Sequence, residues 1–319
     1  MWKYYILLLT ASVLFSTQFV FTKYYQKTKG SGFFYSLVFG IIASFVSIPL
    51  FLAVNKFRFE FSSVSFVLAC VYAVVNISLS AFSTKALSCA NLSFFSLSML
   101  LGAMVVPFIY GVCIGETVTA WKIIAVVAVT ASLFVSPRKN DDKKSSAFAV
   151  VCIVAVFILN GLSSVIVSFH QQKVEEAVSS GAFMVLINLS RFAISIVILG
   201  VLAIKNKITT GRADGEYRSF DEGNQAVSAA DTETNKKRAA KAWLVAIAVS
   251  VGYAVVNGVG NFFLTESAVY VPAVVMYPIV TGGGVFFSAL SGLIFGEKIT
   301  ARTIISIVLV LFGTILMMF

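Results

Sequence analysis

Apolar residues recur along the chain in blocks of about 20 positions, separated by short polar connections. A helix of about this length spans the ~30 Å hydrocarbon core of a bilayer. The pattern predicts ten helices, over residues 3–22, 33–54, 63–84, 92–114, 119–136, 147–169, 181–204, 242–265, 269–295 and 301–318. The last block is almost continuously apolar, whereas barrel strands alternate apolar and polar residues. We therefore predict an all-α polytopic membrane protein.

Two motifs repeat at a separation of 181 positions. The sequence YAVVN at residues 72–76 recurs at 253–257, and the pattern GExxTA at 115–120 recurs at 296–301. Apolar composition alone would hardly reproduce both motifs at one separation, so the pattern indicates an internal duplication. In each GExxTA copy the Thr can cap the following helix. We interpret the two Glu residues as parts of a structural connection and not as proton carriers.

Earlier in the chain the separation is 145, because Tyr25-Gln26 aligns with His170-Gln171. The difference is close to the length of the polar segment 205–241, which we predict to be an inserted, weakly ordered loop. The predicted organisation is a five-helix repeat over 1–136, a linker over 137–146 and a second five-helix repeat over 147–319. Since five is odd, the second copy enters from the opposite face. Such inverted repeats are typical of secondary transporters.

Composition excludes several functions. The chain has 319 residues, 59% of them apolar and 12% charged, with one histidine and four cysteines. These residues cannot supply a usual zinc cluster or Cys/His catalytic pair, so we expect no metal, no cofactor and no enzymatic activity. The net charge of +10 lies mostly in the connections, so we expect contact with membrane lipid and no nucleic acid. The positive-inside rule places both termini outside.

Three stretches resemble a known family. Residues 266–280 (ESAVYVPAVVMYPIV) and 292–300 (GLIFGEKIT) are similar to the second half of the EamA-like branch of the drug/metabolite transporter superfamily. Residues 14–23 resemble its first helix, although Phe15-Ser16 replaces the family's Trp-Gly. The resemblance covers nearly the whole chain outside 205–241. It implies two inverted five-helix repeats around a central cavity, cytoplasmic termini, and transport of small metabolites, commonly outward.

Polar side chains inside the apolar blocks are candidate binding residues. Asn76 and Asn257 hold equivalent places in the two repeats and could hydrogen-bond either a substrate or a neighbouring helix. Asn261 follows in a Gly-Val-Gly-Asn run that could loosen the helix. Arg191, in the middle of the seventh block, carries an insertion penalty of about 2.5–3.5 kcal/mol, so it should face protein or water. It could bind a carboxylate or phosphate, or else snorkel or form a structural pair.

Glycine and proline interrupt corresponding blocks of the two halves. The fourth block contains Gly102 and Pro107, and the ninth contains Pro278, Gly282 and Gly283. Paired helix breaks point to a binding site near the midplane, because a broken helix exposes backbone groups there. The alternative is tight packing of helices at small residues.

The leading hypothesis is a secondary transporter of a small organic or drug-like solute in the cell membrane, with export as the direction that the resemblance favours. A channel or a non-transporting sensor, and less so a membrane-embedded transferase, are the alternatives. The oligomeric state is left open. We expect a cavity lined by the first, third, fourth, sixth, eighth and ninth helices, with binding residues Gln18, Asn76, Arg191, Asn257, Asn261 and Tyr277.

Overall fold

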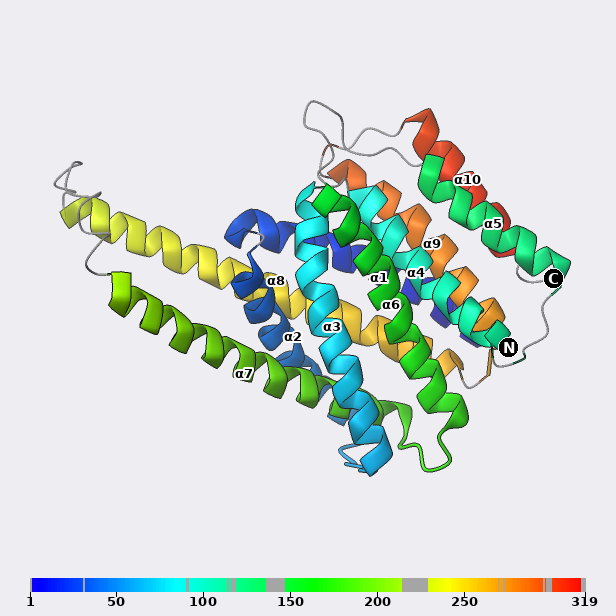
Figure 1. Ribbon diagram of the computed structural model, residues 1–319, viewed down its shortest axis with the longest axis horizontal. Coiled ribbons are helices and arrows are strands. Elements are labelled where there is room, and N and C mark those ends of the chain that lie inside the picture. Colours follow the sequence, from blue (N-terminus) through cyan, green and yellow to red (C-terminus); the bar gives the residue numbers. More distant parts are fainter. Residues whose placement is uncertain are drawn as a thin grey trace.

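The computed structural model is built of α-helices (Figure 1). It describes residues 2–30, 32–89, 92–113, 115, 119–135, 147–213, 229–268, 270–271, 273–294, 296 and 300–316. Within these ranges no strand occurs, and the helices are α1 (Trp2–Lys29), α2 (Phe33–Val54), α3 (Ser63–Cys89), α4 (Leu92–Cys113), α5 (Ala120–Val135), α6 (Ala147–Lys173), α7 (Ser180–Ala213), α8 (Ala229–Ala268), α9 (Ala273–Ile294) and α10 (Ala301–Leu316).

Seven helical segments are long and apolar enough to cross a membrane, judged by length and composition. They are Trp2–Lys29, Phe33–Val54, Ser63–Ser88, Phe94–Cys113, Val150–Gln171, Ser180–Ile204 and Ala240–Ser267. Shorter apolar segments occur in α5, α9 and α10. The predicted class, an all-helical multi-pass membrane protein, is confirmed.

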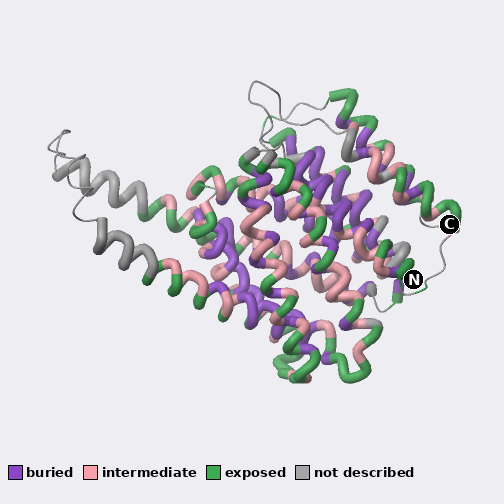
Figure 2. Tube along the Cα trace, in the orientation of Figure 1, coloured by how far each residue is buried: buried purple, intermediate pink, exposed green. Residues whose placement is uncertain are grey.

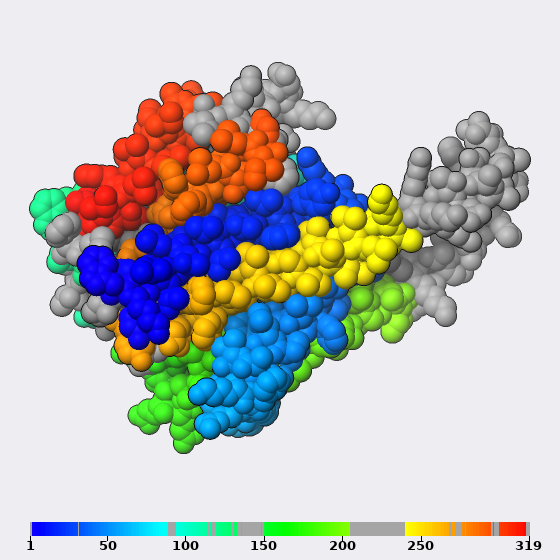
Figure 3. All heavy atoms as spheres, turned by 180° about the vertical axis from the view of Figure 1, so that it is seen from behind, coloured from blue at the N-terminus to red at the C-terminus, as the bar shows by residue number. Residues whose placement is uncertain are grey.

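The helices pack into one bundle. On one face α1 lies between α8 and α9 (Figure 3), while α6 packs against α3 and α4. α4 also packs against α9, and α2 against α7. α5 and α10 lie side by side at one edge of the molecule (Figure 1). Buried residues concentrate on the central helices, and exposed residues on the outer faces and ends (Figure 2).

The prediction of a loop over residues 205–241 is wrong at both ends of this segment. α7 continues to Ala213, and α8 already begins at Ala229, while residues 214–228 lie outside the described part of the chain. The segment is rich in Ala, Lys, Arg and Glu, which are strong helix formers. A helix that is already formed in the membrane adds further turns without a new nucleation step.

The α4–α5 and α9–α10 connections share one geometry. Gly115 and Gly296 both adopt a left-handed backbone, with φ of 86° and 75°, and each donates its N–H to the carbonyl three residues earlier. Thr119 and Thr300 then accept a hydrogen bond on Oγ1 from the backbone N–H three residues later, at 3.4 and 3.3 Å. The predicted Thr caps are therefore confirmed. The Glu residues of the two motifs, Glu116 and Glu297, lie outside the described residues.

The expected interruption of the fourth helix is replaced by close packing. α4 runs as one helix through Gly102 and Pro107. A methyl group on Gly102 would lie 2.0 Å from the backbone oxygen of Phe157 in α6, so only glycine allows this approach. Without a hydrophobic driving force between helices in lipid, such van der Waals contact is a main source of association.

The ninth helix likewise runs unbroken from Ala273 to Ile294. A methyl group on Gly282 would lie 2.9 Å from Thr314 Oγ1, and one on Gly283 would lie 2.8 Å from Ser12. Because these glycines have no side chain, α10 and α1 can pack closely against α9. Pro278 falls within this helix, but its side chain lies outside the described residues.

Hydroxyl side chains of α1 are bonded within their own helix. Six of them donate to the carbonyl four residues earlier at 2.8–3.0 Å: Thr10, Ser12, Ser16, Thr17, Thr22 and Thr28. Such back-bonding satisfies a hydroxyl that has no water to bond. Ser16 additionally lies 3.0 Å from the carbonyl oxygen of Gly284 in α9.

The α2–α3 connection is tied to the α6–α7 connection. Glu60 Oε2 accepts a hydrogen bond from the backbone N–H of Ser179 at 2.7 Å. The Ser179 hydroxyl in turn donates to Asn55 Oδ1 at 3.1 Å. Hydrogen bonds from Ser179 hold the pKa of the Glu60 carboxyl below its ordinary value. Both connections therefore lie on the same face of the bundle.

Candidate functional site

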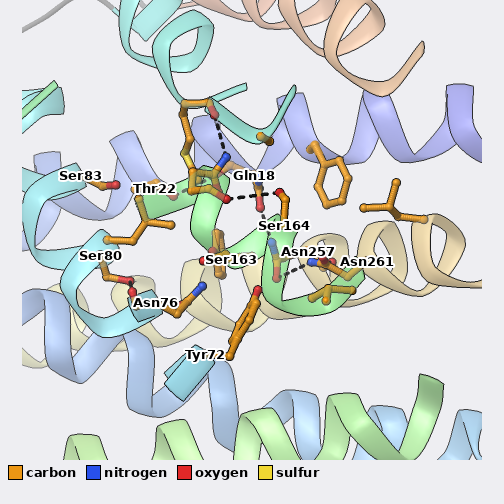
Figure 4. Close-up of a pocket in the computed structure, with 18 of the residues that line it drawn as sticks. Gln18, Thr22, Tyr72, Asn76, Ser80, Ser83, Ser163, Ser164, Asn257 and Asn261 are labelled. Carbon is orange, nitrogen blue, oxygen red and sulfur yellow. Dashed lines mark hydrogen bonds between the residues drawn. The ribbon is translucent and has the colours of Figure 1, made fainter. Parts of the chain in front are cut away.

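A cavity of about 200 Å³ lies at the centre of the bundle (Figure 4). Its walls come from α1, α2, α3, α4, α6, α7, α8 and α9. We expected six of these helices; α2 and α7 are additional. The volume is below the roughly 300–1,000 Å³ of pockets that hold drug-sized ligands, so it suits a smaller solute.

All six residues predicted to bind substrate line this one cavity: Gln18, Asn76, Arg191, Asn257, Asn261 and Tyr277. They come from α1, α3, α7, α8 and α9, and are up to 259 positions apart in the chain. Of the predicted helix-break residues, Gly102, Pro107, Gly282 and Gly283 are absent from the described lining, although their neighbours Ala103 and Thr281 belong to it.

Three amide side chains form a chain of hydrogen bonds between α1 and α8. Asn257 Nδ2 donates to Gln18 Oε1, and Asn261 Nδ2 donates to Asn257 Oδ1 at 3.2 Å (Figure 4). Asn261 Nδ2 also lies 2.8 Å from the backbone oxygen of Asn257. The amides thus join helices and face the cavity at once, so the two interpretations of Asn257 do not exclude each other.

Arg191 enters the cavity from α7. Its side chain is only 9% exposed, and Nη2 donates to Ser80 Oγ of α3 at 3.4 Å. Nε is buried and has no hydrogen-bond partner. On the α2 side the guanidinium lies against Gly40, where a methyl group would come within 3.3 Å of Nη2. Arg191 therefore neither snorkels nor faces lipid.

Tyr72 of α3 and Tyr277 of α9 also belong to the polar part of the wall. The Tyr72 side chain lies near Asn76, one turn along α3. The Tyr277 hydroxyl of α9 lies 3.0 Å from Ser168 Oγ of α6. The predicted contact at Tyr277 is thus on the cavity wall, with its hydroxyl already bonded to a neighbouring helix.

Sequence reasoning missed several lining residues. Tyr72 and Tyr253 occupy equivalent places in the repeated YAVVN motif, so the repeat itself was a signal for them. Asn188 lies one turn from Arg191 on the same helix face, which the 3.6-residue period would have predicted. The serines gave no signal, because serine is frequent throughout these helices; the lining ones include Ser36, Ser47, Ser80, Ser83, Ser163 and Ser164.

Most lining residues fall into pairs at the two separations found in the sequence. Residues of α1, α2, α6 and α7 pair at a separation of 145: 15 with 160, 18 with 163, 19 with 164, 22 with 167, and 39 with 184. Residues of α3, α4, α8 and α9 pair at 181: 72 with 253, 76 with 257, 80 with 261, 83 with 264, 84 with 265, 99 with 280, and 100 with 281. Arg191 has no such partner, since position 46 is Val46 and is absent from the described lining.

The histidine lies away from this cavity. His170 is buried at the end of α6, stacked on Phe183 at 3.6 Å, with Nε2 2.9 Å from Ser65 Oγ. Over the described ranges, no group of three or more His, Cys, Asp or Glu side chains could hold a metal ion. The expectation that the protein uses no cofactor stays a prediction.

Comparisons with known proteins give a fold and no family. No protein-family model matches the chain, and no curated protein matches it. Twenty-eight chains of solved structures match. One of them, described as "Crystal structure of protein", is 13% identical, with a TM-score of 0.59 over 98% of this chain and 96% of that chain. A likeness at this identity extends to the fold alone.

Proposed function

We propose that this chain is a secondary transporter of a small organic solute in the cell membrane, working by alternating access. The observation that carries the proposal is the central cavity, whose polar lining comes from equivalent positions of both halves. A site between two repeats can be opened to either face when one half rocks against the other. The resemblance of residues 14–23 and 266–300 to EamA-like transporters supports the same function, and on that resemblance alone we propose export.

The proposal includes ten membrane spans in two inverted repeats, α1–α5 and α6–α10. If α6 is the counterpart of α1 and so on, helix contacts should occur in exchanged pairs. α1 packs against α8 as α6 packs against α3; α4 packs against α6 as α9 packs against α1; α3 packs against α7 as α8 packs against α2. Counterparts also pair directly, α2 with α7, α4 with α9 and α5 with α10. This exchange supports a two-fold relation between the halves.

Transport is tested with purified protein in liposomes, with a panel of labelled amino acids, organic acids, sugars and nucleobases. We expect saturable flux of at least one solute class. Flux that rises linearly with concentration would favour a channel, and no flux across the panel would contradict the proposal.

Access is tested with single cysteines at equivalent lining positions, Ser80→Cys and Asn261→Cys, in a chain whose four native cysteines are replaced. A membrane-impermeant maleimide is added from one face at a time. Alternating access predicts that conditions which increase labelling from one face decrease it from the other, at both positions. Simultaneous labelling from both faces would favour a channel.

A further inference from the structure

We propose that the cavity binds a small organic monocarboxylate, whose carboxylate pairs with the guanidinium of Arg191. This deepens the proposed function, and rests on it only in treating the bound molecule as the transported solute. Four observations carry it: an uncompensated buried cation, unused donors, a single positive charge, and a small cavity with several aromatic side chains in its wall.

The first observation is the charge balance. Arginine stays protonated in proteins, and Arg191 is nine-tenths buried in the middle of an apolar helix. Among the described residues that line the cavity, none is an Asp or a Glu. A buried charge without a counter-charge destabilises the fold. A ligand that carries a negative charge would remove this penalty, so it would bind more tightly than a neutral molecule of the same shape.

The second observation is the pattern of hydrogen bonds. Arg191 Nη2 donates one long hydrogen bond, to Ser80 Oγ, and Nε is without a partner. Paired N–H groups of a guanidinium match the two oxygens of a carboxylate. In Arg191, Nε is itself buried, and Nη2 and Nε lie on the side of Gly40 in α2. The tyrosines Tyr72 and Tyr253, equivalent in the two halves, lie within electrostatic range of Arg191.

The third observation indicates that the ligand carries a single negative charge. Among the described lining residues, Arg191 is the one Lys, Arg or His. A phosphate monoester, with about −1.5 to −2 charges at pH 7, would bring excess negative charge into the bundle. A zwitterionic amino acid would bring an ammonium group that finds no carboxylate in the described lining. A monocarboxylate matches the single cation.

The fourth observation concerns the rest of the ligand. The cavity volume of about 200 Å³ corresponds to about seven water molecules at their liquid volume. Eight aromatic side chains belong to its wall, alongside many Ser, Thr and Asn residues: Phe15, Phe19, Phe39, Phe51, Phe95, Tyr72, Tyr253 and Tyr277. These rings can pack against an apolar or aromatic body attached to the carboxylate.

The test uses four molecules with one skeleton: 3-phenylpropionate, its neutral amide 3-phenylpropanamide, the zwitterion L-phenylalanine, and the dianion 2-phenylethyl phosphate. Binding to the purified full-length protein is measured by thermal shift and by calorimetry. We expect 3-phenylpropionate to raise Tm and the amide to bind at least about tenfold more weakly, as expected for loss of a charge-assisted hydrogen bond. The zwitterion and the dianion should also bind at least about tenfold more weakly, because their additional charge finds no opposite charge in the described lining. Equal binding of the acid and the amide, tighter binding of the phosphate, or no binding of the acid would overturn the proposal.

Arg191→Gln should weaken binding of 3-phenylpropionate about 10- to 100-fold and leave the weak binding of the amide unchanged. Arg191→Lys keeps the charge but not the paired N–H groups of the guanidinium. Its affinity for 3-phenylpropionate should therefore lie between those of the native protein and Arg191→Gln. Arg58→Gln, an exposed arginine in the α2–α3 connection, is the control and should bind as the native protein does. If Arg191→Gln does not fold, the comparison of the four molecules on the native protein still decides.

The two proposals fail in different ways. Flux of neutral solutes that Arg191→Gln leaves unchanged would overturn the monocarboxylate and keep the transporter. Tight binding of the acid without flux in liposomes would overturn the transporter and keep the anion site.

Discussion

At the scale of single residues, small side chains set how closely these helices approach. Gly102 of α4 and Phe157 of α6 meet with no room for a methyl group. Gly200 of α7, by contrast, has nothing within 4 Å of the place where its Cβ would lie. Both glycines lie in helices, so the pair separates the effect of packing from the effect of helix propensity.

Gly102→Ala should lower the free energy of unfolding by about 1–3 kcal/mol, as overpacking does in other cores. Gly200→Ala, the matched control, should leave it unchanged or raise it by up to about 1 kcal/mol, because alanine favours the helix. Denaturant titration of both variants in detergent measures the two changes. Equal effects at the two sites would show that the α4–α6 contact does not depend on Gly102.

Lining residues were predictable from the sequence where a strongly polar residue lies within an otherwise apolar helix. Asn76, Asn257 and Arg191 stand out for this reason, and the structure brings them to one cavity. Serines such as Ser80 were not predictable, because a back-bonded hydroxyl is tolerated almost anywhere in a membrane helix. The role of Gly102 was not decided by sequence either, since glycine permits both a bend and a close contact.

At the scale of elements, one contact outside the membrane joins two connections. Glu60 at the start of α3 accepts a hydrogen bond from Ser179 just before α7. Because the folded pKa of Glu60 lies below its ordinary value of 4.5, the contact stabilises the fold when the carboxylate is ionised. Its contribution is complete above the unfolded pKa and is lost as the pH falls through the folded pKa.

The Tm of the native protein should therefore fall on acidification below about pH 5 more steeply than the Tm of Glu60→Gln. The difference between the two proteins should be largest near neutral pH and should vanish in acid. Thermal unfolding in detergent at a series of pH values measures this. Parallel curves would mean that the hydrogen bond to Ser179 does not favour the ionised form.

Element positions were largely predictable from hydropathy, because about 20 apolar residues are required to span lipid. The predicted block 33–54 coincides with α2. The ends of α7 and α8 were missed, because residues 205–213 and 229–241 form helix without being apolar. Hydropathy reports which residues enter lipid, and a helix can continue beyond it.

At the scale of the whole molecule, the Glu60–Ser179 contact constrains the number of crossings. It places the α2–α3 and α6–α7 connections on one face, so α3 to α6 must cross the membrane an even number of times. α3, α4 and α6 each contain a segment long enough to cross. We therefore expect the short α5 to cross as well, in agreement with the ten spans that we propose.

The Glu60–Ser179 contact and ten spans together predict which face each connection occupies. Gly32→Cys, before α2, and Glu176→Cys, before α7, should be labelled from opposite faces by an impermeant maleimide, because five helices separate them. Phe59→Cys, in the α2–α3 connection, should be labelled from the same face as Glu176→Cys. A cysteine at Gly32 is tolerable, since its φ is −74° and its Cβ would meet Tyr35 at 3.6 Å. Labelling of all three from one face would exclude inverted repeats.

The back-bonded hydroxyls of α1 bear on how the protein is made. A helix that leaves the translocon alone meets lipid before its neighbours exist, and each unsatisfied polar group then opposes its insertion. In α1 the six back-bonded hydroxyls are satisfied within the helix, so they need no neighbour at that moment. The Gln18 amide differs, because its partner Asn257 is synthesised 239 residues later. The hydroxyls of α1 therefore need no other helix when α1 enters the membrane. The Gln18 amide finds its partner only after α8 has been synthesised.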